Sequence, residues 1–167
     1  MANQSQIQIP PDFEQRYPNA SARATECAMN LVFTADLLVK RISALLQPFD
    51  LSPASGLVLG ILADSETSLP PHTIADRLII SRATVTGLID SLERRGYARR
   101  IPHQSDRRML LIELTPSGRQ VANDFRPIVH LNQKVWLESL SEADQQRLIA
   151  SLHQVQATLM DAELPVP

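Results

Sequence analysis

The sequence contains little cysteine and few aromatic side chains, and each shortage excludes a class of protein. Cys27 is the only cysteine in 167 residues, so no disulfide can form within the chain. Phe, Trp and Tyr together make up 4% of the residues, so Leu, Ile, Val and Ala must supply the core. These aliphatic side chains favour helix packing over a sandwich or a barrel. We therefore expect a mostly α fold.

Long apolar runs are also missing. No apolar segment approaches the roughly 18 to 20 residues that a membrane-spanning helix needs. The first residues, MANQSQIQIPPDFEQ, contain neither a basic region nor a continuous apolar stretch, so export is not expected. With 44% hydrophobic residues, the chain is long enough for one core, or for a core with a satellite lobe. We expect a cytoplasmic protein with no membrane partner.

The charge of the chain is segregated along the sequence. The formal net charge is −2, yet residues 77–108 hold eight arginines against three acids, Asp90, Glu93 and Asp106. This segment carries a local charge of +5, which leaves −7 for the rest of the chain. The stretch RRGYARRIPHQSDRR alone holds six of the 16 basic residues. A charge run is most often a solvated face, so the neighbouring elements must decide its role.

The first third of the chain has the pattern of an arm followed by helices. Residues 1–20 contain three prolines and little periodicity, which predicts an extended arm. Apolar residues at positions i, i+3, i+4 and i+7 predict one long helix within residues 21–50. Ser52 as N-cap and Pro53 as first helical residue predict the start of a second, strongly apolar helix.

Two closely spaced helices and a hairpin are predicted within the lobe formed by residues 51–115. A short third helix is expected at about 71–79, and a fourth at about 81–95, ending before Gly96. The few residues between them match the spacing of a helix-turn-helix. The segments YARRIP and RMLLIELT alternate apolar and polar residues, so residues 97–115 are predicted to form a two-stranded wing.

Residues 116–164 are predicted to form two further helices. Pro127 lies inside the first of them and predicts a kink, because proline has no N–H for the helical hydrogen bond. Ser141 followed by Asp144 resembles a capping box at the start of the second. The apolar stripes of this region and of residues 21–50 exceed what a small lobe can cover, which favours dimerisation. The stripe of the last helix consists of Leu148, Leu152, Val155 and Leu159.

Two stretches of the sequence resemble the MarR family of transcriptional regulators. SDRRMLLIELT resembles the wing signature of that family, an Asp-x-Arg followed by alternating apolar residues and Leu-Thr. TVTGLIDSLERRGYARR resembles its recognition helix and first wing strand. The resemblance in helix order extends from about Ala22 to the end. It implies a winged helix-turn-helix with a two-stranded β wing and an N- and C-terminal helical dimerisation region. It also implies an obligate homodimer on a pseudo-palindromic operator in double-stranded DNA.

The resemblance places a DNA-reading face on the fourth helix and the wing. In this arrangement the helix enters the major groove and reads base edges, while wing arginines reach the minor groove. The carboxylate of Asp106 would orient a wing arginine, leaving Arg108 to enter the minor groove. The predicted helix residues are Ser81, Arg82, Thr84, Thr86, Gly87, Asp90 and Arg94, and the wing residues are Arg100, Asp106, Arg107 and Arg108.

One position departs from the family pattern. Family members commonly have Gly after the Leu that ends the third helix, and this chain has Ile79. A β-branched residue resists positive φ. We therefore predict that the turn uses an ordinary negative φ.

An effector site is expected in the cleft between the dimer helices and the winged lobe. This cleft often receives aromatic or phenolic anions in the family. Helix packing explains Phe33, Leu37 and Leu59 equally well. The four histidines are scattered and His130 is followed by Lys134 at i+4, so neither a metal nor another cofactor is expected. The candidate lining residues are Asn30, Phe33, Thr34, Leu37, Leu59 and His130.

The leading interpretation is therefore a sequence-specific transcriptional regulator, a repressor released by a small aromatic or phenolic ligand. One alternative is a dimeric protein that coats DNA without sequence preference. Another is a thiol-based redox sensor, but Cys27 has no tyrosine pair to hold a thiolate and is interpreted as a buried structural residue. His103 and Asp106 lie on a polar hairpin tip with no cleft-forming sequence nearby, so an enzyme is not expected.

Overall fold

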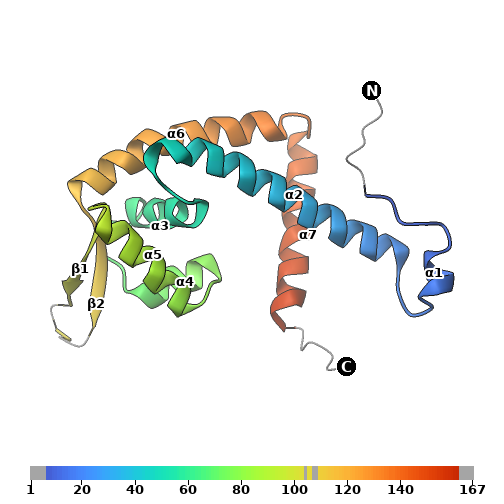
Figure 1. Cartoon of the computed structure of the whole chain (residues 1–167), viewed down its shortest axis with the longest axis horizontal. Helices are drawn as coiled ribbons and strands as arrows, with labels where there is room; N and C mark the ends of the chain where they lie inside the picture. The colour runs from blue at the N-terminus through green and yellow to red at the C-terminus, as the bar shows by residue number, and fades with distance from the viewer. Residues whose placement is uncertain (1–6, 104, 107–108, 162–167) are drawn as a thin grey trace. The chain divides into compact units, whose positions relative to one another are not determined.

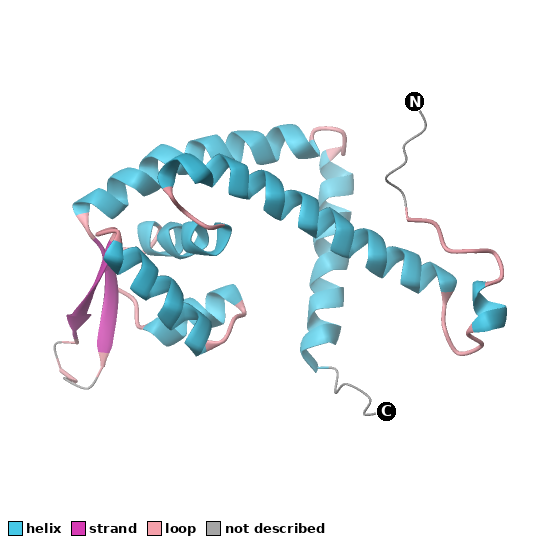
Figure 2. Cartoon of the chain, in the orientation of Figure 1, coloured by secondary structure: helices cyan, strands magenta, loops and turns pink. Residues whose placement is uncertain are grey.

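The chain is mostly helical, with one two-stranded antiparallel sheet, as the sequence predicts (Figures 1 and 2). The computed structural model describes residues 7–103, 105–106 and 109–161. It divides into two compact units, one ending at Arg126 and one beginning at Pro127, which are described separately below. The elements are α1 (Phe13–Arg16), α2 (Ala22–Leu46), the 3₁₀ turn η1 (Gln47–Phe49), α3 (Pro53–Ala63), α4 (Pro71–Leu78), α5 (Arg82–Arg94), β1 (Ala98–Pro102), β2 (Leu110–Leu114), α6 (Pro116–Leu137) and α7 (Glu142–Asp161).

Short-range capping bonds set where the helices begin. The Ser52 hydroxyl accepts from the backbone N–H of Ser55 at 3.1 Å, and the Ser81 hydroxyl accepts from that of Thr84 at 3.1 Å. Thr115 caps α6 and also donates to the carbonyl of Gly96 at 2.6 Å. Each bond satisfies an otherwise unpaired donor or acceptor of a helix terminus or turn. The caps that Ser52, Ser81 and Thr115 provide join residues only three apart, so local sequence indicates these helix starts.

The wing is a hairpin that a third segment extends. β1 pairs antiparallel with β2, with Ala98 opposite Leu114. Leu69, from the loop between α3 and α4, adds a bridge to Ile112 through two backbone hydrogen bonds of 2.9 and 2.7 Å. Ile112 is fully buried. The base of the wing is therefore part of the core and not a free loop.

The core of the first unit lies where α3, α4, α5 and the sheet meet. Val85, Ile89 and Leu92 are fully buried and occupy one face of α5, four and three residues apart. Burying one face of a helix leaves its opposite face to solvent. The rest of this core comes from Leu46, Leu51, Val58, Leu59, Leu62, Leu69, Ile74, Ala75, Ala98, Ile112, Ala122 and Phe125.

Membrane-spanning length is not found in any single helix of the described chain. Two consecutive helical segments reach the length and apolar composition of a membrane span only when they are taken together. They are Ala22–Phe49 and Pro53–Ala63, and they are bent by 71° to each other.

The N-terminal arm is not wholly extended, which corrects the sequence-based expectation. Residues Phe13–Arg16 form the short helix α1. Two pairs at i, i+4 support it: Arg16 with Asp12 at 2.5 Å, and the rings of Phe13 and Tyr17 with centroids 5.0 Å apart. Ile7 accepts a 3.3 Å hydrogen bond from the Asn30 amide, so the arm is attached to α2.

The prediction of a negative φ at Ile79 is wrong. Ile79 has φ 54° and ψ 45°, in the left-handed region. The N–H of Ile80 bonds the carbonyl of Ala75 at 3.2 Å, and the N–H of Ile79 bonds that of Asp76 at 3.4 Å. This is a Schellman ending, which requires a left-handed residue. Tertiary packing of α4 against α5 outweighs the local preference of isoleucine.

The second unit consists of the end of α6 and of α7. Helix α6 is continuous through Pro127. The Ser141 hydroxyl accepts from the backbone N–H of Asp144 at 3.2 Å and donates to its carboxylate at 2.5 Å. The hydroxyl of Ser141, and then the guanidinium of Arg147, hold the pKa of Asp144 below its ordinary value. The start of α7 is thus capped by the Ser and Asp that the sequence indicates.

Candidate nucleic-acid interface

The exposed face of α5 carries the predicted recognition residues. Arg82, Thr84, Thr86, Gly87, Asp90 and Arg94 are all exposed. Ser81 precedes this face, and its hydroxyl is engaged with the backbone N–H and the hydroxyl of Thr84.

Local hydrogen bonds orient part of this face. The Thr86 hydroxyl donates to the carbonyl of Arg82 at 3.0 Å, a bond that leaves its methyl group and both lone pairs of its oxygen available. Arg82 makes no ion pair within the part of the chain that the structure describes. A Cβ atom added at Gly87 would meet nothing within 4 Å, so the surface of the helix is open there. A cation, a hydroxyl and a bare backbone therefore lie on one exposed face.

Asp90 and Arg100, both predicted to contact DNA, contact each other within the chain. The guanidinium of Arg100 donates to the Asp90 carboxylate at 2.6 Å and also pairs with Glu93. Arg100 is only 27% exposed at its side chain. Its neighbour Arg99 is 65% exposed and pairs with Glu113 across the hairpin at 2.5 Å. The charge of Arg100 is thus compensated within the chain.

The tip of the wing is described only in part. Arg107, a predicted wing contact, and Arg108, the residue predicted to enter the minor groove, lie outside the described residues. The backbone N–H groups of Ser105 and Asp106 donate to the His103 ring at 3.2 and 3.3 Å. Met109 closes the turn by donating its N–H to the carbonyl of Asp106 at 3.0 Å. The predicted orienting role of Asp106 stays a prediction.

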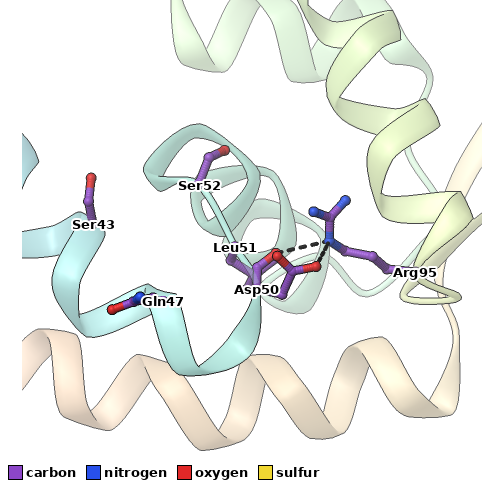
Figure 3. A pocket seen from close by; sticks show the side chains of 6 residues that line it. All are labelled: Ser43, Gln47, Asp50, Leu51, Ser52 and Arg95. Atoms are coloured by element: carbon purple, nitrogen blue, oxygen red, sulfur yellow. Dashed lines mark hydrogen bonds and ion pairs between the residues drawn. The ribbon is translucent and has the colours of Figure 1, made fainter.

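Arg95, at the end of α5, makes contacts that the sequence alone does not indicate. Its Nε donates to the carboxylate of Asp50 at 2.8 Å and to the Asp50 carbonyl at 2.9 Å (Figure 3). Its Nη1 donates to the Ser91 hydroxyl at 2.5 Å. These bonds hold the end of α5 against the corner between α2 and α3. No sequence signal links positions 45 residues apart, so only the structure reveals this pair.

A shallow polar hollow of about 290 Å³ lies beside that pair. None of the six predicted effector residues lines it. Its lining residues are Ser43, Gln47, Asp50, Leu51, Ser52 and Arg95 (Figure 3).

The predicted effector residues have unequal environments. Leu59 is fully buried among core side chains, so it has the packing role and is withdrawn as a lining residue. Phe33 and Leu37 are 39% and 45% exposed on α2, and Thr34 is exposed beside them. The Asn30 amide is bonded to the carbonyls of Ile7 and Glu26. The last candidate, His130, belongs to the second unit and lies 3.2 Å from Gln133.

Cys27 is exposed, which contradicts its interpretation as a buried residue. Cys27 lies near the start of α2, whereas the buried residue of that helix, Leu46, is at its other end. The described residues contain no cluster of three or more His, Cys, Asp or Glu side chains suited to a metal ion.

Comparisons with known proteins show what this architecture is similar to. The MarR family model matches residues 49–109, from η1 into the wing. The HTH-type transcriptional repressor YetL of Bacillus subtilis is 31% identical over 103 residues, which cover 61% of this chain and 62% of YetL. The winged lobe of this chain is therefore similar to the MarR family. The chain spans about three-fifths of the length of the curated relatives that it matches.

Two solved structures share the fold of this chain. The MepR–DNA complex of S. aureus has a TM-score of 0.74 at 24% identity, covering 78% of this chain and 96% of MepR. CouR of Rhodococcus jostii RHA1, bound to p-coumaroyl-CoA, has a TM-score of 0.70 at 20% identity, covering 88% and 100%. The predicted winged helix fold is confirmed.

Proposed function

We propose that the chain is a sequence-specific DNA-binding transcriptional regulator whose helix α5 enters the major groove. The observation that carries this proposal is the two-sided character of α5. Val85, Ile89 and Leu92 bury one face completely, and the other exposes Arg82, Thr86 and Gly87 next to a β hairpin. Arginine and threonine side chains on such a face match base edges in the major groove.

The charge distribution supports the same proposal. The local charge of +5 over residues 77–108 suits a surface that neutralises phosphates, although the whole chain is acidic. The relatives agree in kind, since YetL is a transcriptional repressor and MepR is bound to DNA in its structure. Arg107 and Arg108 of the wing are proposed to supply the minor-groove contacts.

A homodimer on a pseudo-palindromic operator forms part of the proposal. Apolar side chains are exposed along α2 and α7 within one chain, among them Val32 at 66% and Leu159 at 70%. Exposed apolar area on this scale needs a cover, and a second copy provides one by symmetry. Two α5 helices would then read two half-sites.

Release by a small aromatic or phenolic ligand is the regulatory part of the proposal. CouR is similar in fold and is bound to p-coumaroyl-CoA. The open side chains of Phe33 and Leu37 and the hydroxyl of Thr34 are the candidates on α2. Asn30 and His130 remain candidates as polar partners.

The direct test is selection of a binding sequence from a randomised library of duplex DNA, followed by affinity measurements. Arg82→Ala and Thr86→Ala should each cost about 1 to 3 kcal/mol on the selected duplex and little on random DNA. Arg41→Ala on α2 removes an exposed cation far from α5 in sequence and is the matched control. If the wild type retains no preferred sequence and discriminates less than about tenfold, the protein coats DNA without sequence preference.

Substitutions in the wing should affect DNA binding differently from substitutions in α5. Arg108→Ala should lower affinity for all sequences and reduce the salt slope by about 1 per subunit, with discrimination nearly unchanged. Asp106→Ala should resemble Arg108→Ala, although it removes a negative charge. Stronger binding by Asp106→Ala would contradict the orienting role of that carboxylate.

A further inference from the structure

We infer that Arg100 is a positioning residue that fixes the wing to the recognition helix, and not a DNA contact. The inference rests on the proposed function, because it explains how two DNA-reading elements keep their relative geometry. It reverses the role that the resemblance gives to Arg100 and also removes Asp90 from the base-reading face.

The inference is supported first by the several hydrogen bonds and ion pairs that Arg100 makes to α5. Its backbone N–H donates to one carboxylate oxygen of Glu93 at 2.8 Å, and its guanidinium pairs with the other oxygen. The same guanidinium donates to Asp90 at 2.6 Å. Asp90 and Glu93 are three residues apart on α5, so one arginine binds two successive turns of the helix.

Burial distinguishes this cluster from an ordinary surface ion pair. The side chains of Arg100 and Glu93 are 27% and 29% exposed. Exposed pairs contribute little to stability, whereas partly buried, charge-assisted pairs that use a guanidinium fork are stronger and more directional. Arg99, at the adjacent position of the same strand, is 65% exposed and, among the residues that the structure describes, pairs with Glu113 of the hairpin itself.

The register of the wing shows what the cluster fixes. Arg100 lies directly opposite Ile112 in the β1–β2 pairing. Ile112 is bonded on its other side to Leu69 through two backbone hydrogen bonds. At one level of the hairpin, β1 is therefore attached to α5 and β2 to the loop between α3 and α4. Two attachments at the same level restrict rotation of the hairpin relative to α5.

The charges of the cluster argue against a direct phosphate contact. The guanidinium faces two carboxylates, so a phosphate approaching it would meet a cluster with a formal charge of −1. The cation of Arg100 compensates the acids of α5. DNA contact by the wing is left to other arginines.

The first experiment uses the full chain without DNA and measures backbone amide hydrogen exchange in β1 and β2. Arg100→Met keeps an apolar stem of similar length but removes the ion pairs. We expect exchange in the wing to be about tenfold faster, as expected for losing charge-assisted hydrogen bonds. Arg99→Met, with the same change of charge on the same strand, should change it less than about twofold. Equal exchange in Arg100→Met and wild type would overturn the inference.

The second experiment measures affinity and its salt dependence on the duplex selected by the wild type. Arg100→Met should weaken binding about tenfold with an unchanged salt slope, because no phosphate contact is lost. Protection of the minor groove from hydroxyl radicals should decrease, while protection at the bases read by α5 should remain. General unfolding of the protein would remove both kinds of protection. Arg100→Lys, which keeps one ion pair, should recover part of this protection. A salt slope reduced by about 1 per subunit would make Arg100 a phosphate contact and overturn the inference.

A charge-balanced double variant separates positioning from simple charge compensation. Arg100→Met with Glu93→Gln restores the net charge without restoring the pair. Binding should stay about tenfold weaker than wild type, since the two substitutions remove one shared interaction. Recovery to wild-type affinity would overturn positioning. If the wild type selects no duplex at all, the proposed function fails, while the exchange experiment still tests the attachment of the wing.

Discussion

At the scale of single residues, Ile79 stores backbone strain in the helix-turn-helix. Its left-handed φ of 54° costs a β-branched residue about 1 to 2 kcal/mol, and its side chain, 62% exposed, gains little from burial. We predict that Ile79→Gly raises the free energy of unfolding by about 1 kcal/mol in a urea titration. Ile79→Val keeps the branched side chain and should leave stability nearly unchanged. A glycine variant less stable than the valine variant would contradict the strain.

Gly87 allows a prediction in which stability and binding move in opposite directions. Space is open around it and it lies inside α5, so Gly87→Ala should stabilise the fold by about 1 kcal/mol. The added methyl group lies on the face proposed to meet the major groove and should weaken binding to the selected duplex about tenfold. Gly60→Ala, also in a helix with open space, is the control that should stabilise without affecting DNA. If Gly87→Ala binds the selected duplex as tightly as the wild type, DNA does not contact α5 at Gly87.

At the scale of secondary-structure elements, the join between the wing and α6 depends on Gly118. A Cβ atom there would lie 1.8 Å from the carbonyl oxygen of Tyr97, a backbone atom that cannot turn aside. We predict that Gly118→Ala destabilises the first unit by about 3 kcal/mol, measured by urea unfolding. Ser117→Ala, at an exposed neighbouring position, should be nearly neutral. A Gly118→Ala protein as stable as the wild type would show that the backbone near Tyr97 can move to accommodate the added methyl group.

The start of α7 gives a prediction about pH. The Ser141 hydroxyl, followed by Arg147, lowers the pKa of Asp144 in the folded chain, so ionised Asp144 stabilises the fold. That contribution is present above the unfolded pKa of about 3.9 and is lost as pH falls through the lower folded pKa. The stability difference between wild type and Asp144→Asn should therefore be largest near pH 7 and shrink below about pH 4. When Ser141→Ala is also present, the stability difference between the Asp144 and Asp144→Asn proteins should be smaller. An equal difference would contradict the Ser141 hydroxyl as the cause of the lowered pKa of Asp144.

At the scale of the whole molecule, the proposed dimer predicts where association is sensitive. Leu148 and Val155 lie on the stripe of α7 and are 42% and 41% exposed in one chain. Leu148→Asp or Val155→Asp should weaken dimerisation at least tenfold, because a carboxylate would be buried at the interface. Gln154→Asp introduces the same charge on the same helix at a polar, exposed position and should change little. Analytical ultracentrifugation at nanomolar concentration measures all three, and a monomeric wild type would contradict the dimer.

The sequence by itself determined the helix class, the helix starts and the hairpin. These features depend on side chains three or four residues apart, as at Ser52, Ser81 and Ser141, where a hydroxyl caps the backbone that follows it. Apolar spacing likewise separated the buried and exposed faces of α5. The Asp-x-Arg motif of the wing indicated the resemblance to the MarR family, because the motif lies in continuous sequence.

Only the tertiary structure decided which charges pair and where the backbone is strained. Arg100 could equally serve DNA or α5 until folding placed Asp90 and Glu93 around it, and Arg95 meets Asp50 from 45 residues away. Ile79 adopts a left-handed conformation against its own preference because α4 and α5 must pack within a short turn. Such pairings depend on the distances between segments that come together only on folding. The conformational preferences of neighbouring residues in the sequence do not specify those distances.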